Sequence, residues 1–375
     1  MEDLVAMDGN WKDRRVFITG HTGFKGGWLS LWLEGLGAKV TGYSLPAPTQ
    51  PSFYETTRLR DSLADEYIAD IRDSGRLAAA MQSAKPEIVI HMAAQPLVLE
   101  SYENPLETLE TNVLGTANLL NGVRSVESVR AVIVVTSDKC YRNMGTERAF
   151  REDDMLGGAD PYSASKACAE IVTEAYAKSF FPTDAYKEHG VLIASVRAGN
   201  VLGGGDWAKW RLVPDICTTL SNGKVPVIRK PDAIRPWQHV LEPIAGYLMV
   251  GSRLLSGETE FSGSWNFGPD VSATVPVREL ADELVSLWGG DAHWDVANET
   301  QKSEAAILAL DSEKAKTLLG WTPRYTLSEA LRATVEWYQS FANGKEMRHL
   351  SLEQIDRFRH AGTKDETAQA RMTAG

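Results

Sequence analysis

Short apolar runs alternate with amphipathic segments through the first half of the chain. Segments with helical spacing of apolar residues, notably Trp28–Leu36 and Leu106–Val123, lie between runs that predict strands. Strands that are apolar on both faces and separated by helices indicate a parallel sheet covered on both sides. We therefore expect an α/β fold with a doubly wound parallel sheet of the Rossmann type. The predicted strands are Arg15–Thr19, Ala38–Tyr43, Glu66–Asp70, Ile88–His91, Ala131–Thr136 and Val191–Val196.

The alternation ends near residue 200. A stretch rich in Gly, Trp and Arg continues to about residue 240, and helical spacing returns at Arg278–Trp288 and Ser328–Phe341. We expect a nucleotide-binding domain and a smaller C-terminal α/β domain that binds the substrate. The first is predicted to span residues 12–199, with 235–260 returning to it, and the second 200–234 and 261–345. Residues 346–375 are predicted to be a polar tail, frayed from about residue 362.

Composition limits the partners of the protein. The formal net charge of −11 argues against a nucleic-acid or anionic-membrane surface, and an anionic ligand needs a local cluster of Arg and Lys. The three cysteines form no CxxC pair, so we expect no metal site and no disulfide framework. The N-terminal residues lack the pattern of a signal peptide, and no apolar stretch approaches the length of a membrane span. These features predict a cytoplasmic protein.

A glycine-rich turn follows the first predicted strand. The stretch FITGHTGFKGGWL places Gly20, Gly23 and Gly26 in a GxxGxxG pattern before a helix. Glycines there allow backbone N–H groups to approach a pyrophosphate at the helix N-terminus. The pattern alone is as consistent with a structural turn, but its place between strand and helix favours dinucleotide binding.

The ends of the second and third strands bear on the identity of the dinucleotide. Asp70 can accept a hydrogen bond from an adenine amine and Ile71 can pack on the ring, although Asp70 is also a candidate cap for a helix near Asp73. Ser44 stands where NAD enzymes often carry a carboxylate for the ribose, and no Arg follows it. We interpret this pattern as NAD rather than NADP, weakly retained.

Two groups of residues predict acid–base chemistry. Tyr162 and Lys166 in DPYSASKACAE share a helix face, where the ammonium would lower the pKa of the phenol and make it a base near neutral pH. Ser137, Asp138 and Lys139 follow the fifth strand directly. A Tyr and a Lys at this spacing also occur on solvated helix faces, but their position after the fifth strand favours catalysis.

At this point the chain resembles the extended short-chain dehydrogenase/reductase family. The likeness is carried by HMAAQP (91–96), TNVLGT (111–116), PYSASK (161–166) and LGWTPRYTLSEAL, and covers nearly the whole chain. It implies a Rossmann domain that binds NAD, with Tyr162 as catalytic base and Lys166 on the nicotinamide ribose. It further implies cofactor contacts from Thr22, Phe24, Ala93, Ala94 and Asn112, and substrate contacts from Gln95 and Ser101.

Within that family the likeness is greatest to the nucleotide-sugar 4,6-dehydratases. It rests on GHTGFKGGWL, VTSDKCY, RAGNVLGGGDWAKWRLVPD, IRPWQHVLEPIAGYL and SWNFGP. The likeness implies CDP-glucose as the substrate and a 4-keto-6-deoxy sugar as the product. Ser137 would stabilise the 4-oxygen, Asp138 would donate a proton to the departing hydroxyl, and Lys139 would take the C5 proton. Relatives carry Thr-Asp-Glu at this place, so Lys139 is alternatively an electrostatic anchor.

Polar residues after the sixth strand are candidates for binding the diphosphate. Asn200 and Arg211 lie in the Gly-rich stretch and Arg235 lies beyond it, and arginine suits bidentate phosphate contacts. Leu99 stands where the family pattern has an arginine. Three further residues are interpreted equally well as packing or as base-stacking residues: Trp207, Trp237 and His239.

Other functions of the same fold remain open. One alternative is a nucleotide-sugar 4-epimerase or reductase, which needs Tyr162 and Lys166 but no added acid and base. A non-catalytic NAD(P)-sensing regulator is another, although such proteins commonly lose the Tyr–Lys pair. The family resemblance also implies a homodimer, or a dimer of dimers, formed through helices at about Pro105–Val123 and Tyr162–Phe180. It further implies a role in deoxysugar supply for surface polysaccharide such as lipopolysaccharide O-antigen.

Overall fold

A seven-stranded parallel sheet forms the centre of the protein. In the computed structural model, which describes residues 8–143, 145, 148–297 and 308–361, the strand order is β10-β6-β5-β4-β1-β2-β3. All neighbouring strands of this sheet run parallel. The predicted α/β class and doubly wound parallel sheet are confirmed. The strands are β1 (Arg15–Thr19), β2 (Lys39–Ser44), β3 (Asp65–Ile68), β4 (Ile88–His91), β5 (Ala131–Val135), β6 (Leu192–Ala198) and β10 (Gly263–Phe267).

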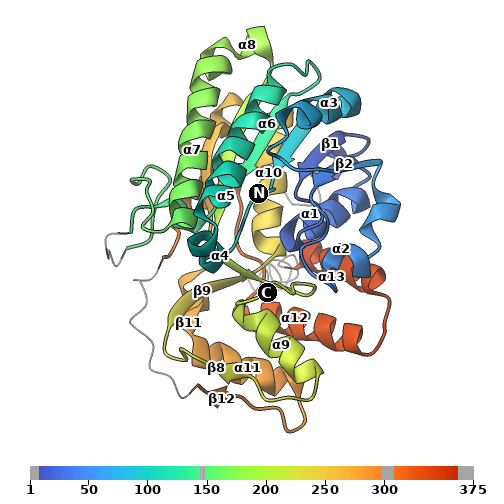
Figure 1. Ribbon diagram of the computed structural model, residues 1–375, viewed down its shortest axis with the longest axis vertical. Coiled ribbons are helices and arrows are strands. Elements are labelled where there is room, and N and C mark those ends of the chain that lie inside the picture. Colours follow the sequence, from blue (N-terminus) through green and yellow to red (C-terminus); the bar gives the residue numbers. More distant parts are fainter. Residues whose placement is uncertain (1–7, 144, 146–147, 298–307, 362–375) are drawn as a thin grey trace, which may run out of the picture.

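Helices cover both faces of this sheet. Helices α1 (Phe24–Gly35) and α10 (Leu241–Leu255) pack with one face, and α3 (Ser74–Ala84), α6 (Gly115–Val123) and α7 (Pro161–Phe180) with the other (Figure 1). Successive strand residues point to opposite faces, so Ile133 joins one core and Val132 the other. Burial of both faces explains why the strands are continuous apolar runs.

The strand order reverses direction between β1 and β4. The chain progresses from β1 outward to β2 and β3, then returns to β4 on the other side of β1. Loops leaving the carboxyl ends of β1 and β4 therefore turn to opposite faces and leave a crevice between them. In open α/β sheets this is where ligands bind.

A smaller part of the chain covers that carboxyl end (Figure 1). It contains a three-stranded sheet of order β11-β9-β7 and a two-stranded pair of β8 and β12. Its strands are β7 (Asn200–Leu202), β8 (Val227–Ile228), β9 (Ile234–His239), β11 (Thr274–Pro276) and β12 (Asp295–Val296). Its helices are α9 (Leu212–Ser221), α11 (Val277–Trp288) and α12 (Leu327–Ala342), the last starting with a capping box between Thr326 and Glu329.

The two parts exchange segments differently from the predicted division. Helix α10, inside the segment expected to return, does cover the main sheet, but β9 in the same segment pairs with β7 and β11 instead. Strand β10, inside the segment assigned to the substrate part, pairs with β6 as the seventh strand. Its sequence GSWNF alternates polar and apolar residues over only four positions, Ser264–Phe267, a short strand signal that the sequence reasoning did not use.

The segment predicted to be a polar tail begins with a packed helix. Helix α13 (Met347–His360) buries Leu350, Ile355 and Phe358, and Phe358 packs edge-on against Trp32 of α1 at 5.7 Å. Many charged residues between these positions conceal their helical spacing in the sequence. The fraying predicted from about residue 362 falls outside the described residues.

One predicted helix contains an irregular turn. The segment Leu106–Val123 consists of α5 (Pro105–Leu109), a π-helical turn (Glu110–Leu114) and α6. Such a turn shifts the direction of the side chains around it and is frequent at functional sites. The remaining short helices are α2 (Phe53–Thr56), α4 (Val98–Glu103) and α8 (Tyr186–His189). Over the described ranges, no helix is both long and apolar enough to span a bilayer.

Candidate active site

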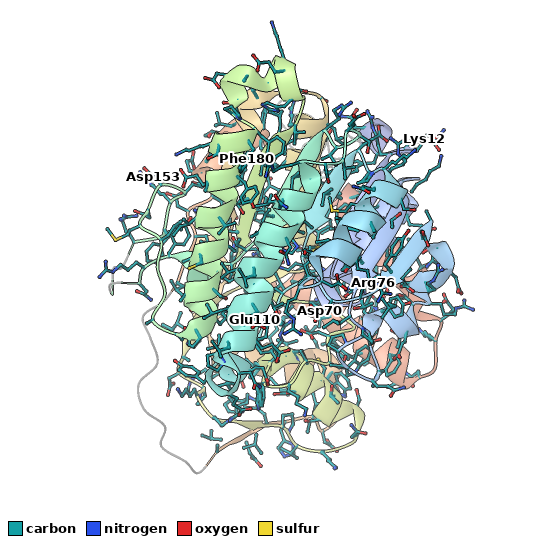
Figure 2. All side chains as sticks on the ribbon, turned by 45° about the horizontal axis from the view of Figure 1, so that its top comes forward. Lys12, Asp70, Arg76, Glu110, Asp153 and Phe180 are labelled. Carbon is teal, nitrogen blue, oxygen red and sulfur yellow. The ribbon has the colours of Figure 1, made fainter. Side chains whose placement is uncertain are left out.

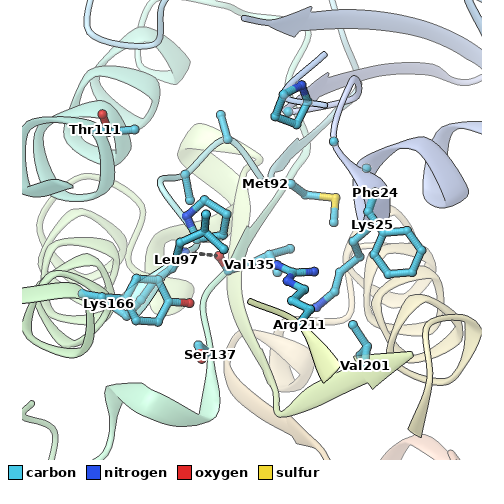
Figure 3. Close-up of a pocket in the computed structure, with 18 of the residues that line it drawn as sticks. Phe24, Lys25, Met92, Leu97, Thr111, Val135, Ser137, Lys166, Val201 and Arg211 are labelled. Carbon is cyan, nitrogen blue, oxygen red and sulfur yellow. Dashed lines mark hydrogen bonds between the residues drawn. The ribbon is translucent and has the colours of Figure 1, made fainter. Parts of the chain in front are cut away.

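A cavity of about 650 Å³ opens at the carboxyl end of the main sheet, between β1 and β4 and beneath the start of α9 (Figure 3). Its volume is in the range of small-molecule sites. Most residues predicted for the site line it, although they come from segments far apart in the sequence. They are Gly20, Thr22, Gly23, Phe24, Gly26, Asp70, Ile71, Ala93, Ala94, Ser137, Asp138, Lys139, Tyr162, Lys166, Asn200 and Arg211.

The glycine-rich turn has no room for side chains at two of its glycines. A Cβ on Gly26 would lie 2.1 Å from the Gly20 carbonyl oxygen, and Gly20 has a φ of +82° with Ala93 N only 2.8 Å from such an atom. Helix α1 starts immediately after Gly23, whose N-cap position carries no side-chain cap. The first N–H groups of the helix are therefore available to an anion. This geometry fits a pyrophosphate.

The far end of the cavity carries a hydroxyl instead of a ribose-binding carboxylate. The Ser44 Oγ lies 2.8 Å from the Thr22 Oγ1 at the end of β2. Asp70, just after β3, accepts hydrogen bonds from two guanidinium nitrogens of Arg72, which also lies 3.4 Å from Glu110. Figure 2 labels Asp70 and Glu110. Hydrogen bonding from Arg72 lowers the pKa of Asp70. An adenine amine would therefore share Asp70 with Arg72.

The capping role considered for Asp70 belongs to another residue. Asp73 is the N-cap of α3 and accepts a hydrogen bond from Arg76 N at 2.9 Å. Asp70 instead contributes its backbone carbonyl to the Tyr43 hydroxyl at 2.9 Å. Both contacts hold the loop that forms this wall of the cavity.

The strand-end residues form a compact polar turn after β5. The Ser137 hydroxyl donates to Asp138 Oδ1 at 2.8 Å and accepts from Lys139 N at 3.2 Å. Asp138 is 3% exposed, whereas the Lys139 side chain is 30% exposed with its Nζ 3.7 Å from Asp138 Oδ1. For Lys139 to act as a base, burial and a neighbouring cation were expected. The structure instead places it partly exposed, next to a carboxylate.

Tyr162 and Lys166 lie at the start of α7. Asp160 caps this helix by accepting from Ser163 N at 2.9 Å, and Pro161 occupies its first position. The Lys166 Nζ donates to the carbonyl of Val135 at 3.4 Å, at the end of β5 (Figure 3). The helix thereby presents both side chains to the cavity beside Ser137.

Burial dominates the charge states of this pair. Burial lowers the pKa of Lys166 to about 8, opposed by the Glu170 carboxylate one helical turn away. Burial also raises the pKa of Tyr162 to about 12, opposed by hydrogen bonding with Ser137. The prediction that the ammonium lowers the pKa of this phenol is wrong for the ligand-free protein, because desolvation of the phenolate outweighs the effect of its neighbours.

Lys25 is a cavity residue that the sequence reasoning missed. It lies inside the glycine-rich motif, and its Nζ is 3.5 Å from the Tyr247 hydroxyl of α10. Burial lowers its pKa to about 7, and the positive charges of Arg211 and Lys166 act in the same direction. A lysine within a Gly-rich cofactor loop was the available signal.

The cavity is positively charged in an acidic protein. Among the described residues that line it, Lys25, Lys139, Lys166, Lys209 and Arg211 carry cationic groups, against the two carboxylates of Asp70 and Asp138. The chain as a whole has a formal charge of −11. A local cluster of cations, as an anionic ligand requires, is therefore present.

Two of the predicted substrate residues support the site from behind. The Gln95 amide donates to Leu97 O at 3.0 Å and to Thr108 Oγ1 at 2.9 Å. The Ser101 hydroxyl accepts from Tyr162 N at 3.2 Å and is fully buried. Neither residue lines the cavity. Their direct contact with substrate stays a prediction, and the observed contacts position Tyr162 and the loop after β4.

Asn112 and Arg235 also lie outside the cavity wall. Asn112, in the π-helical turn, donates to Ser165 Oγ at 2.8 Å and accepts from Gln95 N at 2.8 Å. It therefore connects the loop after β4 to α7. The Arg235 guanidinium, on β9, donates to Ile234 O at 2.8 Å. A cofactor contact for Asn112 and a diphosphate contact for Arg235 remain predictions.

The outer rim of the cavity combines a held arginine with apolar side chains. Arg211 donates to Asp206 Oδ2 at 2.7 Å just before α9. Trp210, with a left-handed φ of +63°, is 44% exposed, and Leu99 across the loop after β4 is 49% exposed. Both line the cavity, so an apolar side chain occupies the rim where the family pattern has an arginine.

The three aromatic residues with open roles are packing residues in this structure. Trp207 packs edge-on against Trp337 and Phe341 at 5.5 and 5.1 Å. His239 is buried beside Trp28 and Tyr325, and Trp237 is buried on β9. None of the three lines the cavity.

Comparison with known proteins places this fold and site in a family. The model of the family described as GDP-mannose 4,6 dehydratase matches residues 17–334. The chain is 50% identical over 354 residues to CDP-glucose 4,6-dehydratase of Salmonella typhimurium strain LT2, covering 94% of this chain and 98% of that one. It is 26% identical to dTDP-glucose 4,6-dehydratase 1 of Escherichia coli K12, over 87% and 93% of the two chains.

Solved structures of lower identity share the fold. A UDP-glucose 4-epimerase from Thermotoga maritima, solved with UDP-glucose, superposes with a TM-score of 0.73 at 22% identity, over 87% of this chain and 99% of that one. The dTDP-glucose 4,6-dehydratase DesIV from Streptomyces venezuelae, solved with NAD bound, gives 0.70 at 23% identity, over 89% and 99%. The chain belongs to the nucleotide-sugar epimerase/dehydratase family of short-chain dehydrogenases/reductases, as its motifs predicted.

Proposed function

We propose that the protein is an NAD-dependent 4,6-dehydratase that converts CDP-glucose into CDP-4-keto-6-deoxyglucose. The observation that carries this proposal is the placement of Asp138 and Lys139 in the same cavity as Tyr162 and Lys166. An epimerase or reductase needs only the second pair, whereas loss of water needs an added acid and base. The 50% identity to the Salmonella CDP-glucose 4,6-dehydratase supports the substrate.

The cavity fits NAD. Helix α1 starts after Gly23 without a side-chain cap, so its first N–H groups are available to the pyrophosphate, and Ile71 forms part of the cavity wall. The residues that would hold the cofactor are Gly20, Thr22, Gly23, Phe24, Gly26, Asp70, Ile71, Ala93 and Ala94, with Lys166 at the nicotinamide ribose. NAD, when bound, supplies the acceptor for the C4 hydride and later returns that hydride to C6.

Tyr162 and its neighbours perform the first proton transfer. Tyr162 takes the proton of the sugar 4-hydroxyl, and Ser137, which lies close enough to hydrogen-bond the phenol, stabilises the same oxygen. The Lys166 ammonium, held at the end of β5, stabilises the phenolate form of Tyr162, which accepts this proton and becomes the phenol. Burial of all three side chains excludes water from this transfer.

Asp138 and Lys139 perform the loss of water. The Lys139 Nζ lies 3.7 Å from Asp138 Oδ1, so the two groups reach the same part of the cavity. With the proton on Asp138, the carboxylic acid can donate to the departing 6-hydroxyl while the neutral amine of Lys139 takes the proton from C5. The pair thus provides an acid and a base at once without any change in its net charge. In the alternative role, Lys139 keeps its proton and only stabilises the charge of Asp138.

The substrate diphosphate is assigned to the cationic rim. Arg211, oriented by Asp206, and the amide of Asn200 lie where β7 and α9 meet the cavity. Arg235, Gln95 and Ser101 are assigned by the family resemblance to the same substrate. Ser44 in place of a carboxylate at the end of β2 supports weak retention of NAD.

The test is incubation of the purified protein with NAD and CDP-, UDP-, dTDP- or GDP-glucose. The expected result is loss of water from CDP-glucose and a 4-keto product that absorbs in alkali. Inversion at C4 without loss of water would instead identify an epimerase, and NAD binding without turnover of any of the four sugars would identify a non-catalytic protein. A different preferred nucleotide would overturn the substrate and keep the reaction.

We also propose that the protein is a cytoplasmic homodimer, with a dimer of dimers as the larger alternative. Large apolar side chains are exposed along α5, the π-helical turn and α7, including the end of α7 at Phe180 (Figure 2). A surface of this kind supports association. Light scattering should give a dimer that Leu106→Glu converts to a monomer. The exposed side chains are Leu106, Leu109, Leu114, Ile171 and Phe180.

The cellular role is proposed from the same evidence. Three free cysteines, two of them buried, are consistent with a reducing compartment. A 4-keto-6-deoxy sugar is chemically a precursor of further deoxysugars. We propose that the product supplies deoxysugars for surface polysaccharide such as O-antigen, which deletion of the gene and analysis of the surface sugars would test.

A further inference from the structure

A buried carboxylate lies beneath the site and has no part in the chemistry above. Glu170 follows Tyr162 by eight residues and Lys166 by four, so the three share one face of α7. It is 4% exposed and accepts hydrogen bonds from Thr136, Ser195 and Arg197. Four donor groups on β6 and the end of β5 thus converge on one side chain of the catalytic helix.

The first of these contacts reaches the beginning of the catalytic turn. The Thr136 hydroxyl donates to Glu170 Oε1, and Thr136 directly precedes Ser137 in the chain. Both side chains are buried, so water does not compete for the hydrogen bond. The position of Ser137 relative to α7 therefore depends on Glu170.

The second contact reaches the end of the same turn. Arg197 donates to both oxygens of Glu170, at 2.9 and 2.8 Å, and its third nitrogen donates to the Tyr141 hydroxyl at 2.5 Å. The guanidinium also lies 4.9 Å from the centre of the Tyr141 ring. Tyr141 immediately follows the short helix Asp138–Cys140, which contains Lys139. The Tyr141 hydroxyl also donates to Asn266 Oδ1 at 2.8 Å.

We infer that the buried Glu170–Arg197 pair is the positioning element that holds the Ser137–Lys139 turn in register with Tyr162 and Lys166. The inference rests on the proposed function, because only a dehydratase needs both groups to act on one sugar. Thr136 holds the turn just before Ser137, and Tyr141 holds it just after Cys140. Both contacts lead through the Glu170–Arg197 pair to α7, the helix that carries Tyr162 and Lys166. A misplacement of about 1 Å at such a site can cost about 100-fold in rate.

The negative charge of Glu170 also acts on Lys166. Hydrogen bonds from Arg197, Thr136 and Ser195 outweigh burial and lower the pKa of Glu170, so it is ionised. The Glu170 carboxylate and Cys140 raise the pKa of Lys166 against the effect of burial. The other titratable groups that face Lys166 are His91 on β4 and Lys25 on α1. The same residue that positions the turn therefore helps to keep Lys166 charged.

Two variants each cut one of the two connections to the turn and leave the Glu170–Arg197 ion pair intact; Tyr141→Phe also removes the hydrogen bond to Asn266. Thr136→Val preserves the shape of the side chain and removes its hydrogen bond to Glu170. Tyr141→Phe removes the hydroxyl that accepts a hydrogen bond from Arg197. We expect kcat for CDP-glucose to fall by about tenfold or more in each, with KM changed by less than about twofold. Their unfolding in urea is measured in parallel.

Ser195→Ala is the matched control. It removes a 2.7 Å hydrogen bond to the same carboxylate, but Ser195 lies within β6 and has no link to the turn. It should leave kcat within about twofold of the wild type and cost about as much stability as Thr136→Val, since each of these two variants loses one buried hydrogen bond. Equal loss of kcat in all three variants, or wild-type kcat in Thr136→Val and Tyr141→Phe, would overturn the inference.

A charge test is independent of substrate. In Glu170→Gln the titration of Lys166, followed by the ¹³Cε shift and assigned with Lys166→Met, should move to lower pH. Glu174→Gln, which alters an exposed carboxylate paired with Lys178 one turn along α7, should leave it unchanged. An unmoved titration in Glu170→Gln would contradict the charge role. If Glu170→Gln does not fold, the single-contact variants decide.

Failure of this inference and failure of the proposed function are distinguishable. A wild-type protein that does not turn over CDP-glucose disproves the function, while the Lys166 titration still tests the charge role of Glu170. A wild-type protein that is active, with Thr136→Val and Tyr141→Phe equally active, keeps the function and disproves the positioning role.

Discussion

Lys166 and Lys139 reach the same cavity from opposite surroundings. Lys166 is 6% exposed, projects from the second turn of a long helix, and is held by the Val135 carbonyl and the charge of Glu170. Lys139 is 30% exposed on a three-residue turn and lies 3.7 Å from Asp138. The pair proposed to oxidise C4 is therefore part of the folded core, whereas in the pair proposed to eliminate water only Asp138 is buried and Lys139 lies at the edge of the core.

This difference separates two kinds of substitution. A change on the oxidation side removes a buried group and stops the reaction at its first step. A change on the elimination side alters a partly exposed turn and should let the first step continue. Variants on the two sides should therefore accumulate different sugar species. Measuring whether oxidation or loss of water fails in each variant tests the distinction between the two sides.

The largest effect is expected for Tyr162→Phe. Loss of the base for the 4-hydroxyl should lower kcat/KM for CDP-glucose by about 10²- to 10⁴-fold and abolish both oxidation and elimination. The measurement is the rate of product formation at saturating NAD. Tyr176→Phe, on the same helix but away from the cavity, is the control and should keep wild-type activity. A Tyr162→Phe variant within a few-fold of the wild type would refute the assignment.

The next effect is expected for Lys139→Met. Elimination and exchange of the C5 hydrogen with solvent should fall by about 100-fold, because no other assigned base faces C5, while some oxidation at C4 continues. Deuterium incorporation at C5 and product formation are measured together. Lys316→Met changes a lysine outside the cavity wall that pairs with Asp270, and should leave both rates nearly unchanged. Normal turnover in Lys139→Met would assign it the anchoring role.

A smaller effect is expected for Arg211→Lys, at the cavity rim and away from the two pairs of catalytic residues. Arg211→Lys keeps the charge but loses the planar bidentate geometry, so KM for CDP-glucose should rise by about tenfold, or about 1.4 kcal/mol, with kcat little changed. Arg278→Lys, which alters an exposed arginine paired with Asp232, is the control. A fall in kcat at unchanged KM would place Arg211 in the chemistry instead.

The smallest effect concerns stability and the third lysine. The pKa of Lys25 is lowered to about 7 by burial and by the charges of Arg211 and Lys166, below its value in the unfolded chain. The unfolded state therefore binds more protons between pH 7 and about 10.4, and the penalty for the buried charge is complete below pH 7 and fades as the pH rises.

Lys25→Met should accordingly raise the midpoint of urea unfolding most below pH 7, with the gain shrinking toward pH 10. Lys178→Met, which changes an exposed lysine, should show no such trend. A gain independent of pH would mean that apolar packing, not relief of the charge, stabilises the variant.

The sequence was informative where the backbone repeats a simple pattern. The strand bounds Arg15–Thr19 and Ile88–His91 were predicted correctly, because strands buried on both faces are short and continuously apolar. The sequence correctly placed the glycine-rich turn at the cavity. The structure explains the glycine at position 20, because a Cβ there would clash with the loop after β4. Motifs of this kind are local, so their spacing in the chain is also their spacing in space.

Features that depend on tertiary contacts were not predictable in the same way. Strand β10 alternates over only four residues, and its pairing with β6, about 70 residues earlier in the chain, is a tertiary contact. Asn112 and Ser101 match family motifs, yet the structure uses them to support α7 from outside the cavity. The raised pKa of Tyr162 follows from its burial, which the four-residue spacing to Lys166 does not reveal.

The most direct test of the account is the fate of the hydrogen at C4. With CDP-[4-²H]glucose and NAD, the product should have lost water and should carry the deuterium at C6, because the same hydride leaves C4 and returns at C6. Mass spectrometry and proton NMR of the product give this result in one experiment. Deuterium retained at C4 of an unchanged or inverted sugar would contradict the assignment of a 4,6-dehydratase.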